Sequence, residues 1–204
     1  GGDKGTLVAP GDYTVALSQY VDGVFSTLGA PVAFKVKSLN NTVLPAKDRG
    51  VLESFQKEVN ELARVVGGAQ NSMGELRNEL KHIKEAINKS LTDQEALTTA
   101  YTEFRKKLNG VAVGINGDRV ASQLDIDKPM SVSQRLGLIQ YEMYNSTSGP
   151  TQTHITGIAI AKEEFQPHLE SLRTLIKVDL VKLQRQLESA GAPYTPNRVI
   201  VPLN

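Results

Sequence analysis

The chain has 204 residues, with 23 Lys and Arg against 22 Asp and Glu and a formal net charge of +1. This balance argues against a nucleic-acid binder, which carries a basic excess, and against a disordered charged tail. The absence of Cys excludes disulfides, thiolate metal sites and a cysteine nucleophile, and no apolar run approaches the roughly 20 residues of a membrane-spanning helix.

The N-terminal residues predict a small β module over residues 1–44. Apolar and polar side chains alternate over 13–18 and again over 32–37, which is the pattern of half-buried strands. The connection between them contains Asp22-Gly23 and Gly29-Ala30-Pro31. Because two strands alone are marginally stable in water, we expect them to pack on something else. The chain starts with Gly1-Gly2 and no Met, so we expect it to be a piece of a longer protein.

A long amphipathic helix is predicted from about Ala46 to Lys89. Its apolar residues alternate three and four apart for about five heptads, without loss of phase at Gly67-Gly68 or Gly74. Each of these glycines costs about 1 kcal/mol in a helix, yet the unbroken phase favours one continuous helix. The apolar row consists of Leu52, Phe55, Val59, Leu62, Val66, Ala69, Met73, Leu76, Leu80, Ile83 and Ile87.

Two more helices follow after short connections. Thr92 and Glu95 have the spacing of a capping box and predict the start of the second helix, which ends at residues 116–118. Ser131 and Gln134 repeat this spacing and predict the start of the third helix.

A fourth long helix is predicted from Pro150 to residues 190–191, with a kink at Pro167. Because short connections make neighbouring helices antiparallel, the fold class is mainly α, an elongated up-down-up-down four-helix bundle over residues 45–191 with the β module at one end. The extension 192–204 contains Val199-Ile200-Val201, which we expect to return to the β module as a strand. The heptad row can serve a partner helix or the bundle's own core, and we favour the core.

The polar residues show no catalytic, cofactor-binding or metal-binding pattern. The pairs Asp125/Asp127 and Glu163/Glu164 are each local, which favours turn and solvated-helix roles over paired acid–base chemistry. No GxSxG motif occurs. The three histidines, His82, His154 and His168, do not have the spacing of a helical metal site. The central glycines, Gly110, Gly114 and Gly117, do not match a phosphate-binding loop.

The glycosylation sequons and the tyrosines each allow a functional and a purely structural interpretation. Three triplets match the glycosylation sequon, at Asn40, Asn88 and Asn145, and matter only in a suitable host. Five tyrosines could form a carbohydrate platform, although core-edge positions are the commoner role for such residues; they are Tyr13, Tyr20, Tyr141, Tyr144 and Tyr194.

Two stretches resemble a known family. Residues 8–17, followed by Phe34-Lys35-Val36, look like the last strands of an immunoglobulin-like module of bacterial exported proteins. The tail over 191–198 resembles the C-terminal end of large Bacteroidetes-type proteins with sortilin-like or neuraminidase-type propeller repeats, which are often labelled glycosyl hydrolases. The resemblance implies export to the periplasm or cell surface, with the propeller and any active site upstream of Gly1, so no catalytic residue carries over.

We therefore expect a non-catalytic C-terminal accessory region that acts as a spacer, docking surface or interaction module. Its partners would be the upstream propeller of the same chain, another protein or a carbohydrate, with no nucleic acid and no cofactor or metal. The alternative is a stand-alone helical protein that oligomerises through an exposed part of the heptad row. A hydrolase would need Asp125, Asp127, Glu163 or Glu164 to meet in a pocket.

Overall fold

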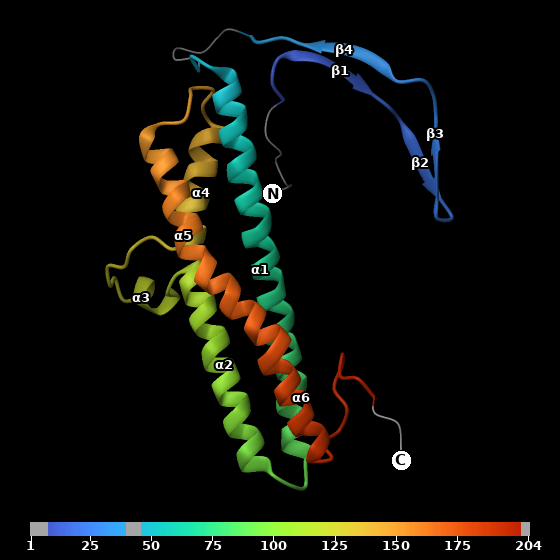
Figure 1. The fold of residues 1–204 in the computed structure, drawn as a ribbon, viewed down its shortest axis with the longest axis vertical. Helices are drawn as coiled ribbons and strands as arrows, with labels where there is room; N and C mark the ends of the chain where they lie inside the picture. Colours follow the sequence, from blue (N-terminus) through green and yellow to red (C-terminus); the bar gives the residue numbers. More distant parts are fainter. Residues whose placement is uncertain (1–7, 40–45, 201–204) are drawn as a thin grey trace.

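A computed structural model describes residues 8–39 and 46–200, which form a small β region followed by a mainly helical rod (Figure 1). The expected helical class and the small N-terminal β region are confirmed. The elements are β1 (Gly11–Val15), β2 (Ser18–Val21), β3 (Val24–Thr27), β4 (Val32–Val36), α1 (Arg49–Lys89), α2 (Gln94–Asn116), α3 (Arg119–Gln123), α4 (Val132–Tyr144), α5 (Gln152–Thr174), the π-helical turn η1 (Leu175–Asp179) and α6 (Leu180–Ser189).

The strands form one long antiparallel ribbon that bends away from the rod (Figure 1). β1 pairs with β4 and β2 pairs with β3. The tip is the two-residue turn Asp22-Gly23, where both residues have positive φ, 50° and 83°. This geometry matches the twist of a hairpin and explains the Asp-Gly sequence. The expected strands are present, and the segment expected to be a connection holds two further strands.

Helix α1 runs unbroken over 41 residues, as the apolar phase predicts. It begins where the Asp48 carboxylate accepts hydrogen bonds from the N–H groups of Gly50 and Val51. Ten of the eleven residues of the predicted apolar row are buried, and Leu52 is half-buried. The row packs against the other helices of the same chain, which confirms its assignment to the core.

Helices α2 and α4 lie end to end along α1 and run in the same direction. Gln70, in the middle of α1, donates hydrogen bonds to Asn116 at the end of α2 (2.7 Å) and to Ser133 at the start of α4 (3.0 Å). Beyond α4, the Thr147 carbonyl accepts a hydrogen bond from the Ala46 N–H near the start of α1 (3.1 Å). Together, α2 and α4 therefore cover the length of α1 and are antiparallel to it.

The last leg, α5–η1–α6, runs parallel to α1. Lys162 contacts Glu58 at 2.6 Å near the first end of the rod, and Gln184 donates to Glu79 at 2.8 Å near the other. The rod therefore has three passes, and the predicted up-down-up-down order is not observed. That prediction assumed that every connection reverses the chain, whereas residues 117–131, with α3, make an outward excursion and resume the same direction (Figure 1).

The helix starts were predicted with mixed success. The Ser131–Gln134 capping box is confirmed by two reciprocal hydrogen bonds. The Thr92–Glu95 box is wrong, because α2 begins after Asp93 and the Thr92 hydroxyl donates instead to the Ala190 carbonyl at 2.9 Å. The last leg begins after Thr151 rather than at Pro150.

Helix α5 continues through Pro167, and its departure from α-helical geometry comes later, at η1. A π-helical turn holds one extra residue, so the buried face moves. Leu172 before the turn, Leu175 at its first position and Leu180 after it are buried, whereas Ile176 is 36% exposed. The expected inward position of Ile176 assumed a regular helix.

The C-terminal extension does not return to the β module as a strand. Val199 and Ile200 are exposed and have no strand geometry, and Val201 lies outside the described residues. The reason is the number of passes: α6 ends beside Ser90 and Thr92, at the C-terminal end of α1, rather than beside its start.

Candidate functional site

The inner half of the ribbon has one apolar and one polar face. The register pairs Tyr13 with Phe34 and Val15 with Val32, which places these four residues on one side of the ribbon. The two aromatic rings stack with centroids 5.8 Å apart. The opposite side carries the ion pair between Asp12 and Lys35 at 3.2 Å. We refer to Tyr13, Val15, Val32 and Phe34 as the apolar face of the ribbon.

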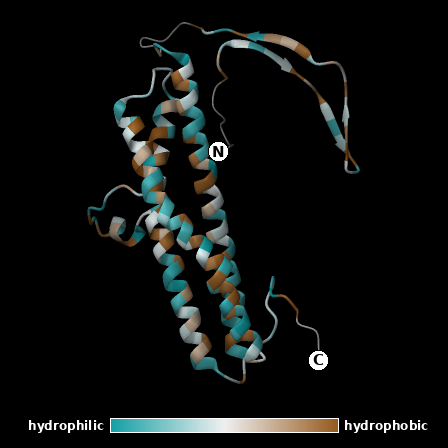
Figure 2. Cartoon of the chain, viewed as in Figure 1, coloured by the Kyte–Doolittle hydropathy of each residue, from teal (hydrophilic) through white to brown (hydrophobic). Residues whose placement is uncertain are grey.

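This apolar face remains in contact with solvent. Val15, Val32 and Phe34 are 56%, 63% and 48% exposed. In the outer half of the ribbon, the rings of Tyr20 and Phe25 pack at 4.5 Å, yet Phe25 is 76% exposed. Figure 2 shows hydrophobic residues along the ribbon at a distance from the rod. Contiguous apolar surface of this kind marks interaction sites, so the ribbon is the main candidate surface.

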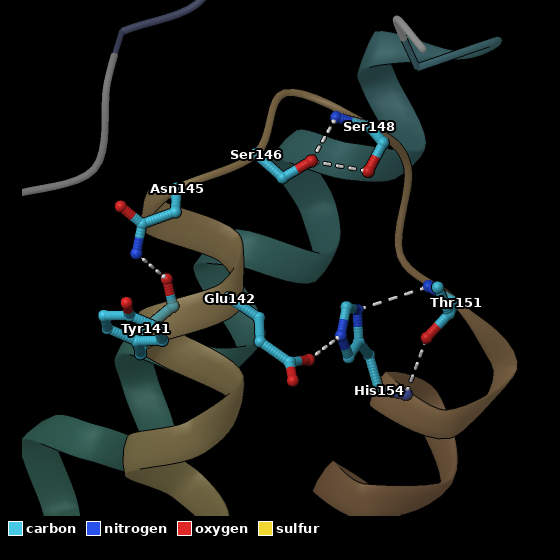
Figure 3. A network of polar contacts seen from close by, with 7 residues as sticks. All are labelled: Tyr141, Glu142, Asn145, Ser146, Ser148, Thr151 and His154. Carbon is cyan, nitrogen blue, oxygen red and sulfur yellow. Dashed lines mark hydrogen bonds and ion pairs between the residues drawn. The ribbon is translucent and has the colours of Figure 1, made fainter.

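A polar network joins the end of α4 to the start of α5 (Figure 3). His154 is the N3 residue of a capping box with Thr151: its Nδ1 accepts the Thr151 N–H at 3.3 Å, and the Thr151 hydroxyl accepts the His154 N–H at 3.2 Å. Since Nδ1 accepts, Nε2 carries the proton and donates to the Glu142 carboxylate at 2.5 Å. The imidazole also stacks on the Phe55 ring, 6.4 Å away.

The geometry of this network indicates a structural contact between α4 and α5. A catalytic His–carboxylate pair leaves one ring nitrogen facing a nucleophile. Here both nitrogens of His154 are engaged, and the nearby hydroxyls of Ser146 and Ser148 bond to each other at 2.7 Å (Figure 3). His154 was expected to have a surface or cap role, and the structure places it in a cap.

The other predicted site residues lie apart from one another. The His168 ring fills the space that a Cβ on Gly114 would occupy, and His82 is half-buried on α1. Asp125, Asp127 and Glu163 are exposed, while Glu164 lies 3.9 Å from Arg135. Over residues 8–39 and 46–200, no group of three or more His, Asp or Glu side chains is arranged to hold a metal ion.

The tyrosines and sequons are also dispersed. Tyr13 and Tyr20 lie on the ribbon, Tyr141 and Tyr144 on α4, and Tyr194 in the C-terminal extension. The Asn145 amide donates to the Tyr141 carbonyl at 2.7 Å, Asn88 is exposed on α1, and Asn40 lies outside the described residues.

Among the ionisable groups, Glu61 has a shifted pKa. A direct hydrogen bond from Arg64, one turn along α1, lowers the pKa of this carboxyl group and raises that of the guanidinium. Both side chains are exposed, so the pair belongs to a solvated helix face and not to a tuned site.

A groove of about 780 Å³ lies between the first half of α2 and the η1–α6 segment. Its walls include Glu95 and Glu103 from α2 and Asp179 and Lys182 from the last leg. Sequence reasoning missed this groove because its two walls are more than 70 residues apart in the chain. Only the packing of the last leg against α2, with the Lys107–Asp179 ion pair between them, brings the walls together.

The C-terminal extension is anchored by Arg198, whose side chain is 4% exposed. Its guanidinium donates to the Ala192 carbonyl at 2.7 Å, lies 3.2 Å from Glu188 and stacks 4.2 Å from the centre of the Tyr194 ring. These contacts fold residues 192–198 back onto the end of α6.

The chain matches no family model, no curated protein and no solved structure. Within the described part of the chain, none of the helices combines the length and apolar character needed to cross a bilayer.

Proposed function

We propose that this chain is a non-catalytic accessory module of a longer exported protein, and that its ribbon docks by the apolar face onto β-structure of the same parent. The observation that carries this proposal is the exposure of Val15, Val32 and Phe34 on a two-stranded ribbon. Such a ribbon is marginal in water and gains stability when a third strand or a facing sheet covers it.

The ribbon segment resembles the last strands of an immunoglobulin-like module. This resemblance indicates that the facing sheet of a β-sandwich would cover the apolar face. In a sandwich, the inward side of each sheet is apolar and the outward side polar. The ribbon meets this pattern, with Tyr13 and Phe34 on one side and the Asp12–Lys35 ion pair on the other. The missing strands would come from the parent chain, together with the propeller that the resemblance implies.

The rod supports a structural role for the rest of the module. Its apolar rows are buried against one another, and His154 uses one ring nitrogen to close the cap of α5 and the other to join α5 to Glu142 of α4. A rod with a sealed interior serves as a spacer between neighbouring parts of a parent protein.

Hydrogen exchange of the ribbon amides tests the docking proposal. In the 204-residue chain alone, we expect amides of residues 11–36 to exchange fast, and in the parent protein to be protected at least a hundredfold, because docking suppresses opening. The α1 amides serve as the internal control. Equal, fast exchange in both proteins would contradict docking, and glycoside turnover by the isolated chain equal to that of the parent would contradict the non-catalytic role.

Self-association is the second candidate, because the same exposed face can pair two copies of the chain. The heptad row of α1 is already buried, so an oligomer would form through the ribbon rather than through that row. Light scattering over a range of concentrations separates the two: a dimer that Phe34→Ser dissociates supports self-association, and a concentration-independent monomer excludes it.

A further inference from the structure

The groove between α2 and the η1–α6 segment, here called the α2–α6 groove, has the geometry of a seat for a helix. On α2 the lining positions fall at 94–96, 99, 100, 103, 104 and 107, and on the other wall at 179, 182, 183 and 186. Beyond the first turn of α2, both sets follow the three-and-four spacing of one helix face. Two adjacent helices with such stripes form the open side of a bundle, into which a further helix packs.

The floor of the α2–α6 groove allows close approach. Phe104 and Leu183 are buried beneath it, at 3% and 2% exposure. Ala96, Thr99 and Ala100 line the α2 wall above them. Small side chains at these positions let the backbone of an incoming helix approach to about 8–10 Å between axes, the normal distance for packed helices.

The rim carries uncompensated negative charge. Asp179 is paired with Lys107 at 2.9 Å. Within the described residues, the carboxylates of Asp93, Glu95 and Glu103 have no ion-pair partner, and the opposing unpaired cation of the groove is Lys182 alone. Three free carboxylates therefore face one free ammonium group.

We propose that the α2–α6 groove binds one amphipathic helix of a partner protein, with small apolar residues toward the floor and Lys or Arg toward the rim. The groove runs from Asp93 to Lys107 along α2, which corresponds to about 21 Å at 1.5 Å per residue. A partner helix of about 14 residues fills this length. The proposal concerns a different surface from the ribbon and stands independently of the function proposed above.

The test uses a labelled synthetic peptide of about 14 residues, amphipathic as a helix, with Lys three or four residues apart and Ala and Leu elsewhere. Fluorescence anisotropy with the full 204-residue chain measures its dissociation constant. An isomeric peptide with a scrambled order and a peptide with Glu in place of Lys are the controls. We expect the amphipathic basic peptide to bind at least tenfold more tightly than either control, and more weakly as salt rises.

Variants of the chain locate the binding. Glu95→Gln and Glu103→Gln should each weaken the basic peptide about twofold to fivefold, as expected for exposed ion pairs, and Lys182→Glu should strengthen it. Ala100→Leu should reduce binding by filling the floor. Glu85→Gln, at an exposed carboxylate on α1 outside the groove, is the matched control and should leave the dissociation constant of the peptide unchanged.

Each outcome decides the proposal. Equal binding of the amphipathic and scrambled peptides, or binding insensitive to Glu103→Gln and Ala100→Leu, would overturn it. Self-association of the chain that Ala100→Leu abolishes would also overturn it, because the occupant would then be a second copy. Circular dichroism of each variant confirms that the helices are intact.

Discussion

Histidine is a common catalytic residue, but the contacts of His154 indicate a structural role. Its ring is 15% exposed and lies between Glu142 of α4 and the first turn of α5. Each ring nitrogen has a defined partner: Nδ1 accepts from the N-cap of α5 itself, and Nε2 joins α5 to Glu142 of α4. The sequence indicates a cap role for such a residue but does not reveal Glu142, because an ion pair across two helices has no local signature.

We predict that His154→Leu destabilises the fold by about 1 kcal/mol, the usual cost of a lost helix cap. His154→Gln should recover most of this loss, because Gln at the N3 position is the ordinary reciprocal partner of a capping Thr. Urea denaturation of both variants measures the difference. Equal stability of the two variants would show that the capping box contributes nothing.

At the scale of the element, α2 and α5 approach each other at one glycine. The His168 ring occupies the space where a Gly114 side chain would begin. The sequence shows Gly114 as one of several helical glycines, and nothing local separates it from Gly110, which has open space around it. The positions of the helices and their apolar faces were predictable from periodicity, whereas this contact depends on the crossing of two helices distant in the chain.

Gly114→Ala should therefore destabilise the fold by about 1–3 kcal/mol, because the added methyl group displaces the imidazole and the packed helix behind it. Gly110→Ala, one turn away, is the matched control and should stabilise by up to about 1 kcal/mol through helix propensity alone. Thermal unfolding compares the two. A stabilising Gly114→Ala would mean that His168 moves aside at no cost.

The hairpin tip can be predicted from the sequence, whereas the π-helical turn cannot. Asp22-Gly23, flanked by Tyr20-Val21 and Val24-Phe25, is a recognisable hairpin signal, so β2 and β3 could be predicted from the sequence. The π-helical turn was not, because Leu172, Ile176 and Leu180 fit a regular helix equally well. Only the packing of Leu175 into the core decides between the two phases.

At the scale of the whole molecule, the ribbon and the rod have separate sources of stability. The buried hydrophobic residues all belong to α1, α2, α3, α4, the last leg and the segment after it, and none of the ribbon residues joins them. The four long helical segments were predictable, whereas the short helix α3, the π-helical turn and the order of helix directions were not. That order depends on residues 117–131, whose turn and apolar residues do not specify whether the chain reverses.

We predict that Phe34→Ala changes the free energy of unfolding of the rod by less than about 0.5 kcal/mol, as for an exposed side chain. Phe165→Ala, at a residue that is 3% exposed, should cost about 3–5 kcal/mol. Helical ellipticity during denaturation reports on the rod in both variants. A large loss from Phe34→Ala would show that the ribbon packs on the helices in solution.

The odd number of passes has a mechanical consequence. The chain enters the rod at Arg49 and leaves it at Ser189, which lie at opposite ends of α1, a helix about 60 Å long. Tension between these two points acts along the helix axes and must slide whole apolar rows past each other, whereas in a bundle with an even number of passes the same tension would peel the helices apart turn by turn. We therefore expect the rod, when pulled at these two points, to resist extension more strongly than a bundle with an even number of passes.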